Sequence, residues 1–126
     1  MLFPKIKKFL SIFFLLFISV TLLAQNSPPE ITATGNQLYC PGTDINIATS
    51  ITIIDTDDTG TEAMYIQISS GYQNGEDSLT LTGTHPAIST VWNAATGKLE
   101  LNSTSGGEVL YTYFISAIED VVYTYY

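Results

Sequence analysis

The chain has 126 residues, 45% of them hydrophobic, and it carries 12 acidic residues against four basic ones. Lys98 is the only lysine or arginine after residue 24, whereas all 12 acidic residues follow that position, so the formal charge of residues 25–126 is −11. Nucleic acids and anionic membrane surfaces bind clustered cations, so this charge excludes both as partners. Residues 25–126, about 100 residues, are enough for one small domain. Cys40 is the only cysteine, which excludes an internal disulfide.

The first 24 residues have the three-part pattern of a secretory signal peptide. Three lysines open the chain, residues 9–23 are almost wholly apolar, and Ala24 is a small residue before a polar run. We expect cleavage after Ala24, export to the cell surface or the medium, and no stable membrane span afterwards. The alternative is an uncleaved membrane anchor, but a largely apolar segment of 15 residues falls short of the roughly 20 that span a bilayer. Residues 25–126 then form the mature domain.

Short apolar segments predict β-strands through the first half of the mature domain. Residues 31–34 are predicted as an edge strand, and residues 45–54 as a longer strand with a kink or a bulge. In residues 64–68 the apolar side chains alternate with Tyr65 and Gln67, which is the period of a half-buried strand. Residues 78–82 alternate again. Acidic loops separate the last three of these strands, a pattern typical of all-β extracellular modules.

The second half predicts a hairpin, a helix and a final strand. Residues 88–92 and 98–102 flank a five-residue connection that ends in Gly97, which is typical of a β-hairpin. From residue 107 to residue 118 the apolar side chains are spaced as on one face of a helix. Residues 121–126 are predicted as a strand.

The order of several motifs resembles bacterial cadherin-like repeats. These motifs are the acidic turn at residues 55–58, the segment 66–79 with its Gly-Tyr and Gly-Glu-Asp elements, Trp92, the segment 97–101, and a helix leading to residues 121–123. The similarity is greatest to the amino-terminal module of large secreted proteins of gliding, Bacteroidota-type bacteria. That module also has a Tyr-Cys-Pro-Gly segment near its start, as residues 39–42 do here.

The resemblance implies an immunoglobulin/cadherin-like antiparallel β-sandwich with one short α-helix near the C-terminus. It also implies a place in multidomain surface adhesins, which are type IX secretion substrates and often carry a lectin-like domain downstream. The family adds a further strand after the segment that matches residues 121–123, and this chain does not contain it. We therefore expect an N-terminal fragment of a larger protein that lacks its last strand, with neighbouring domains as its partners.

Acidic side chains in two loops suggest a calcium site. Calcium binds six to eight oxygen atoms, mostly carboxylates and carbonyls supplied by turns. Asp55, Asp57 and Asp58 are spaced so that their carboxylates converge in a turn, and Glu76 and Asp77 could join them from the next loop. The alternative is that aspartate simply forms turns and keeps an exported domain soluble. No complete EF-hand loop is present.

The sequence offers little for catalysis. His85 is the only histidine and Cys40 the only cysteine, so a Ser-His-Asp or Cys-His centre would have to form around a single candidate that no motif supports. One histidine and one cysteine also supply at most half of a tetrahedral zinc site. To act as in a glycosidase, the carboxylates of Glu76 and Asp77 would have to face each other across a substrate-binding cleft. We predict that the protein is not an enzyme.

Trp92 allows a second functional hypothesis. An exposed tryptophan with tyrosines beside it forms a platform on which sugars stack. A place beside a hairpin instead favours packing in the core or at its rim. The first hypothesis is therefore a non-enzymatic adhesion and spacer module that calcium stabilises. The rival is a carbohydrate-binding module that uses Trp92 and the exposed tyrosines to bind glycans.

Overall fold

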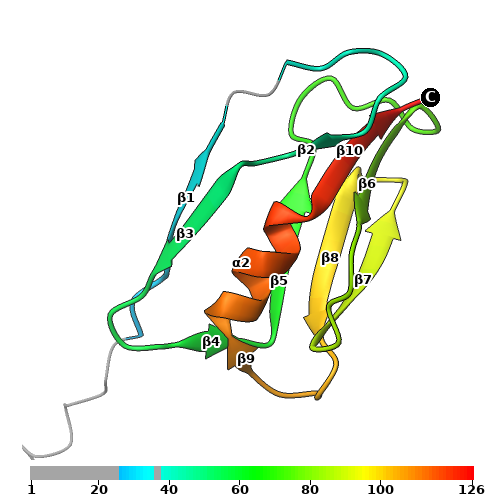
Figure 1. Ribbon diagram of the computed structural model, residues 1–126. Coiled ribbons are helices and arrows are strands. Elements are labelled where there is room, and N and C mark those ends of the chain that lie inside the picture. Colours follow the sequence, from blue (N-terminus) through cyan, green and yellow to red (C-terminus); the bar gives the residue numbers. More distant parts are fainter. Residues whose placement is uncertain (1–25, 36–37) are drawn as a thin grey trace, which may run out of the picture.

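The computed structural model describes residues 26–35 and 38–126 (Figure 1). The predicted signal peptide lies outside the described residues. The elements in chain order are β1 (Glu30–Thr34), β2 (Ile45–Asn46), β3 (Ser50–Ile54), β4 (Gly60–Thr61), β5 (Ala63–Gln67), β6 (Asp77–Leu81), β7 (Ile88–Asn93), β8 (Lys98–Ser103), β9 (Val109–Leu110), α2 (Tyr111–Glu119) and β10 (Val121–Tyr125).

All strand pairs between these elements are antiparallel. β1 pairs with β3, β4 pairs with β9, β10 lies between β2 and β6, and β8 lies between β5 and β7. In Figure 1 the β1–β3 pair lies on one side of α2, and the β5–β8–β7 sheet lies on the other. The predicted class, mostly β with one short helix near the C-terminus, is confirmed, and the arrangement is consistent with a β-sandwich-like fold.

The core lies between the sheets and α2. Alternation along β8 buries Leu99 and Leu101, which are 1% and 0% exposed, and helical spacing buries Phe114 and Ala117, both 0% exposed. Val121 at the start of β10 is also fully buried. The apolar side chains of the alternating strands and those of the helical face therefore pack in a single cluster, as the sequence predicts.

The helix begins later than the sequence pattern predicts. Instead of starting at residue 107, it starts at Tyr111, because Val109 and Leu110 form β9 and pair with Gly60 and Thr61. The first helical N–H is satisfied by a distant carbonyl, since Tyr111 N donates to the Thr59 oxygen at 3.0 Å. The apolar spacing alone does not show where β9 ends and α2 begins, because the strand that pairs with β9 lies about 50 residues earlier.

The predicted strand at residues 45–54 is two strands in the structure. β2 pairs with β10, whereas β3 pairs with β1, so the two halves belong to different sheets. Between them the backbone N–H of Ile47 donates to Val121 at 3.0 Å and that of Thr49 donates to Thr34 at 2.9 Å. The expected kink is thus the point at which the chain passes from one sheet to another.

Candidate metal centre

The turn between β3 and β4 is built on Asp55. Its Oδ1 atom accepts the backbone N–H groups of Asp57 and Asp58, each at 3.2 Å. An aspartate that accepts the N–H two or three residues ahead replaces a backbone turn bond. The local spacing of the three aspartates therefore dictates the turn that holds them, which we call the aspartate turn (residues 55–58).

Tyr111 fixes the other oxygen of Asp55. The tyrosine lies at the start of α2, is 9% exposed, and donates its hydroxyl proton to Asp55 Oδ2 at 2.7 Å. This hydrogen bond, with help from the two turn N–H groups and against some desolvation, lowers the pKa of Asp55 from 3.8 to about 2. The same bond raises the pKa of Tyr111 to about 12. Asp55 is therefore an anion at neutral pH.

Asp57 and Asp58 hold the segment that precedes β1. Ser27 N donates to Asp57 Oδ2 at 2.8 Å, and the Asn26 side-chain amide donates to Asp58 Oδ2 at 2.9 Å. Each of the two carboxylates keeps an Oδ1 atom that accepts no hydrogen bond from the residues described. The turn is thus connected to α2 on one side and to residues 26–27 on the other.

The three aspartates could hold a metal ion. One oxygen from each carboxylate lies within 4.8 Å of the others, and Asp57 is exposed while Asp55 and Asp58 are half-buried. A set of carboxylate oxygens suits a hard cation such as calcium or magnesium. Calcium takes six to eight oxygens, so water or carbonyl oxygens would have to complete the coordination.

Glu76 and Asp77 are not part of this cluster. Asp77 is 7% exposed and accepts the hydroxyl of Tyr123 at 2.5 Å and the N–H of Gln73 at 2.6 Å. Glu76 accepts the hydroxyl of Tyr125 at 2.6 Å. These bonds raise the pKa of Tyr123 to about 12 and raise that of Tyr125. The predicted calcium ligands of the second loop instead fasten it to β10.

His85 and Cys40 lie in different loops, and His85 has an acidic partner. His85 Nε2 lies 3.0 Å from Asp120 Oδ2, and its side chain is only 9% exposed, so the predicted loop histidine is anchored beside the end of α2. Cys40 is exposed in the loop before β2. Within the described ranges the aspartate turn is the one group of three or more potential ligands. No local pattern indicates the partner of His85, because Asp120 lies 35 residues later.

Trp92 and the most exposed strand tyrosine lie on opposite faces of one sheet. Trp92 pairs in register with Leu99, which is buried, whereas Tyr65 pairs with Glu100, the next residue of β8. Successive residues of a strand point to opposite faces, so Trp92 shares the core face. The Tyr72 ring packs edge-on against Trp92 with their centroids 6.1 Å apart. This geometry favours core packing over a shared sugar platform.

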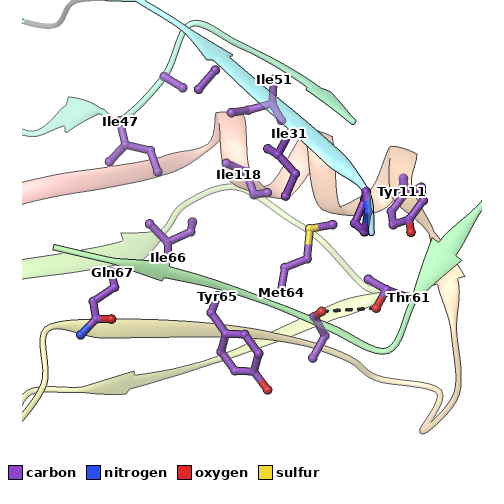
Figure 2. A pocket seen from close by; sticks show the side chains of 14 residues that line it. Ile31, Ile47, Ile51, Thr61, Met64, Tyr65, Ile66, Gln67, Tyr111 and Ile118 are labelled. Carbon is purple, nitrogen blue, oxygen red and sulfur yellow. Dashed lines mark hydrogen bonds between the residues drawn. The ribbon is translucent and has the colours of Figure 1, made fainter. Parts of the chain in front are cut away.

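A pocket that the sequence did not reveal lies between β1, β3, β5 and α2 (Figure 2). Its volume is about 530 Å³, and its lining is mostly apolar, with Ile31, Ile51, Met64 and Ile118 pointing into it. These residues come from four elements that are far apart in the chain. Only the assembled sheets bring them together, so no local pattern could have indicated the pocket.

Comparison with known proteins gives no relative for this chain. No protein-family model, no curated protein and no solved structure matches it. Within residues 26–35 and 38–126, no helix is both long enough and apolar enough to cross a bilayer. Function must therefore be argued from the site itself.

Proposed function

We propose that this chain is a non-enzymatic, exported module of a bacterial surface adhesion protein, which spaces and presents the neighbouring domains. We further propose that calcium bound at the aspartate turn stiffens it. The observation that supports this is the position of the turn. Asp55 is bonded to Tyr111 on α2, while Asp57 and Asp58 are bonded to residues 26–27. The cadherin-like order of motifs agrees with such a role.

The electrostatics of the turn favour a cation. Three carboxylates whose oxygens lie within 4.8 Å of one another repel each other. In the described part of the chain Lys98 is the only lysine or arginine, and its ion pair is with Glu100. A divalent ion held by Asp57 Oδ1 and Asp58 Oδ1, with Asp55 beside them, would remove this repulsion. It would also hold the start of the domain against the turn.

Thermal unfolding with excess calcium and then with chelator tests the proposal. A ligand that binds only the folded state, at about 100 times its dissociation constant, adds roughly 2.7 kcal/mol of stability. For a domain of this size the melting temperature should then rise by about 10 °C or more. Equal melting temperatures in the two buffers would show that the aspartates only form the turn.

Two variants decide whether the effect belongs to the turn. Replacing Asp57→Asn together with Asp58→Asn keeps the shape of the side chains and an oxygen to accept the Asn26 and Ser27 donors, but removes two charges. We expect the calcium effect to disappear in this double variant. Asp44→Asn is the control, because Asp44 is exposed and accepts a hydroxyl from Thr124 instead. A calcium effect that survives in the double variant would place the ion elsewhere.

A further inference from the structure

The pocket between β1 and β5 is a groove that follows the edge of a strand. Five consecutive residues of β5, from Ala63 to Gln67, line it. Met64 and Ile66 point to one face of the sheet, and Tyr65 and Gln67 point to the other. A groove that meets both sets must run along the backbone edge between the two faces. Figure 2 shows Met64 and Ile66 on the groove side of β5.

This edge of β5 has no neighbouring strand in the described ranges. β5 is hydrogen-bonded to β8 on one side only, and β1 likewise pairs only with β3. An open strand edge presents free N–H and C=O groups, and it is a template for another extended segment. The open edge of β5 is five residues long, and a strand of that length spans about 17 Å.

β1 supplies the opposite wall with one of its faces. Pro29, Ile31 and Ala33 line the groove, which are alternate residues, so β1 presents a side-chain face and not an edge. Ile31 is 54% exposed and points into the groove (Figure 2). In a strand added beside β5, every second side chain would therefore point into the groove. These side chains would lie between Ile31 on one side and Met64 and Ile118 on the other.

The charges around the groove select the occupant. Asp55 is hydrogen-bonded to Tyr111, which lines the groove beside Thr61 at the end where β5 begins (Figure 2). Glu62 lies in the sequence between two groove residues, Thr61 and Ala63. The one cation of the described residues, Lys98, is 3.1 Å from Glu100 and 4.6 Å from the centre of the Tyr65 ring. A second copy of this chain would bring another strongly acidic surface and be repelled. A segment with lysine or arginine would be attracted.

We propose that the groove binds an extended segment of a partner protein, about five residues long with alternating apolar side chains and flanking cations, which adds as a strand to the free edge of β5. Main-chain hydrogen bonds to β5 provide affinity, and the alternate apolar side chains that fill the pocket provide selectivity. The proposal does not depend on calcium, and it would stand if the aspartate turn binds no ion.

The probe is a fluorescent peptide of sequence Lys-Thr-Val-Thr-Val-Thr-Val-Lys, titrated with the full chain and followed by anisotropy. Lysine at both ends brings a cation to the acidic end of the groove in either strand direction. We expect a dissociation constant in the micromolar range that rises with salt. The matched peptide with glutamate in place of both lysines should bind at least tenfold more weakly. Failure of the lysine peptide to bind would overturn the proposal.

Two isoleucines of the β1–β3 pair supply a matched pair of variants. Ile31 and Ile54 are 54% and 58% exposed, but only Ile31 lines the groove. Ile31→Ser should raise the dissociation constant about tenfold, because the peptide would cover the exposed half of this side chain. Ile54→Ser should leave it unchanged. Equal effects of the two variants would show that the peptide binds elsewhere.

N-methylated peptides test whether binding uses the strand edge. In a strand, every second residue directs its N–H to the same edge. Methylating the nitrogens of one alternate set should therefore abolish binding, while methylating the other set should leave most of it. Equal effects of both sets would reject strand addition. Sedimentation of the chain without peptide should show a monomer, and a dimer broken only by Ile31→Ser would assign the groove to a second copy instead.

Discussion

Asp77 shows how a loop carboxylate becomes a structural residue. It is 7% exposed, and its two oxygens accept a hydroxyl from Tyr123 and an N–H from Gln73. A carboxylate buried without donors costs several kcal/mol, so these bonds are required for the loop to pack. The acidic pair at residues 76–77 therefore holds the loop before β6 against β10. Both carboxylates accept hydrogen bonds from within the domain.

Removing the hydroxyl of Tyr123 should destabilise the domain. In Tyr123→Phe the ring can still pack, but Asp77 Oδ1 loses its donor, which we expect to cost about 1–3 kcal/mol of unfolding free energy. Urea unfolding at pH 7 measures this loss. Tyr125→Phe is the control, because its partner Glu76 is half-exposed and can bond to water, so the loss should be smaller.

The same bond predicts a dependence on alkaline pH. The hydrogen bond to Asp77 raises the pKa of Tyr123 from 10.0 to about 12 in the folded protein. The stabilisation is therefore fully present below pH 10 and is lost as the pH rises through 12. The gap in stability between the parent and Tyr123→Phe should close over that range. A gap that stays constant would contradict the assigned bond.

At the residue scale, the sequence predicts what depends on neighbours a few positions away. The aspartate turn follows from the spacing of Asp55, Asp57 and Asp58, and the structure brings all three together. The hydroxyl that binds Asp77 belongs to a residue 46 positions later. That contact exists only after β6 and β10 have paired, so sequence spacing could not distinguish a metal ligand from an anchored carboxylate.

For whole elements too, the sequence predicts features that depend on adjacent residues and not those that depend on distant pairing. The hairpin of β7 and β8 was predicted because its strands and its glycine turn are adjacent, and Gly97 adopts a positive φ of 64°. The start of α2 was predicted wrongly because β9 is defined by its pairing with β4. Gly60 makes that pairing possible, since a Cβ atom at this position would collide with the carbonyl of Val109.

Gly60→Ala should therefore disturb β4, β9 and the start of α2. Its new methyl group meets rigid backbone, so we expect a loss of about 1–3 kcal/mol, as for an overpacked core. Gly107→Ala is the matched control, because a Cβ there has no atom within 4 Å and the backbone is not left-handed. Thermal melts of both variants give the comparison. Equal stability of the two would show that β9 does not need the close approach at Gly60.

On the scale of the whole molecule, one hydrogen bond links parts that are distant in the chain. Asp55 directly follows β3 and Tyr111 begins α2, and the two are 56 positions apart. Because the bond lowers the folded pKa of Asp55 from 3.8 to about 2, its stabilisation is present above pH 3.8 and is lost as the pH falls through 2.

Tyr111→Phe tests this link between elements. We expect the variant to be less stable than the parent at pH 7, and the difference between them to shrink between pH 4 and pH 2. Urea unfolding at pH 7, 4 and 2 measures it. Tyr113→Phe, a change at an exposed tyrosine of the same helix, should have no effect at any of these values. A difference that is the same at pH 7 and pH 2 would show that Tyr111 contributes through packing alone.

The mostly-β class with one late helix could be predicted because alternation and helical spacing recur along the whole chain. Which strands become neighbours could not, since β2 and β3 look like one strand and join two different sheets. The groove beside β5 depends on the sheet that β3 joins, because residues of β1 and β3 line it together with β5. It is a property of the assembled sheets, and its lining residues carry no shared local signal.

The antiparallel register of β1 and β3 determines how the domain would respond to mechanical tension. β1 begins beside the aspartate turn, and β10 ends at the far end of the molecule (Figure 1). A pull between these points runs parallel to the strands, so the five β1–β3 residue pairs, from Glu30 with Ile54 to Thr34 with Ser50, would be loaded in shear. Hydrogen bonds loaded in shear must break together, whereas hydrogen bonds loaded one at a time break in sequence at a lower force. A chain pulled at these two points would therefore resist extension until the β1–β3 residue pairs yield.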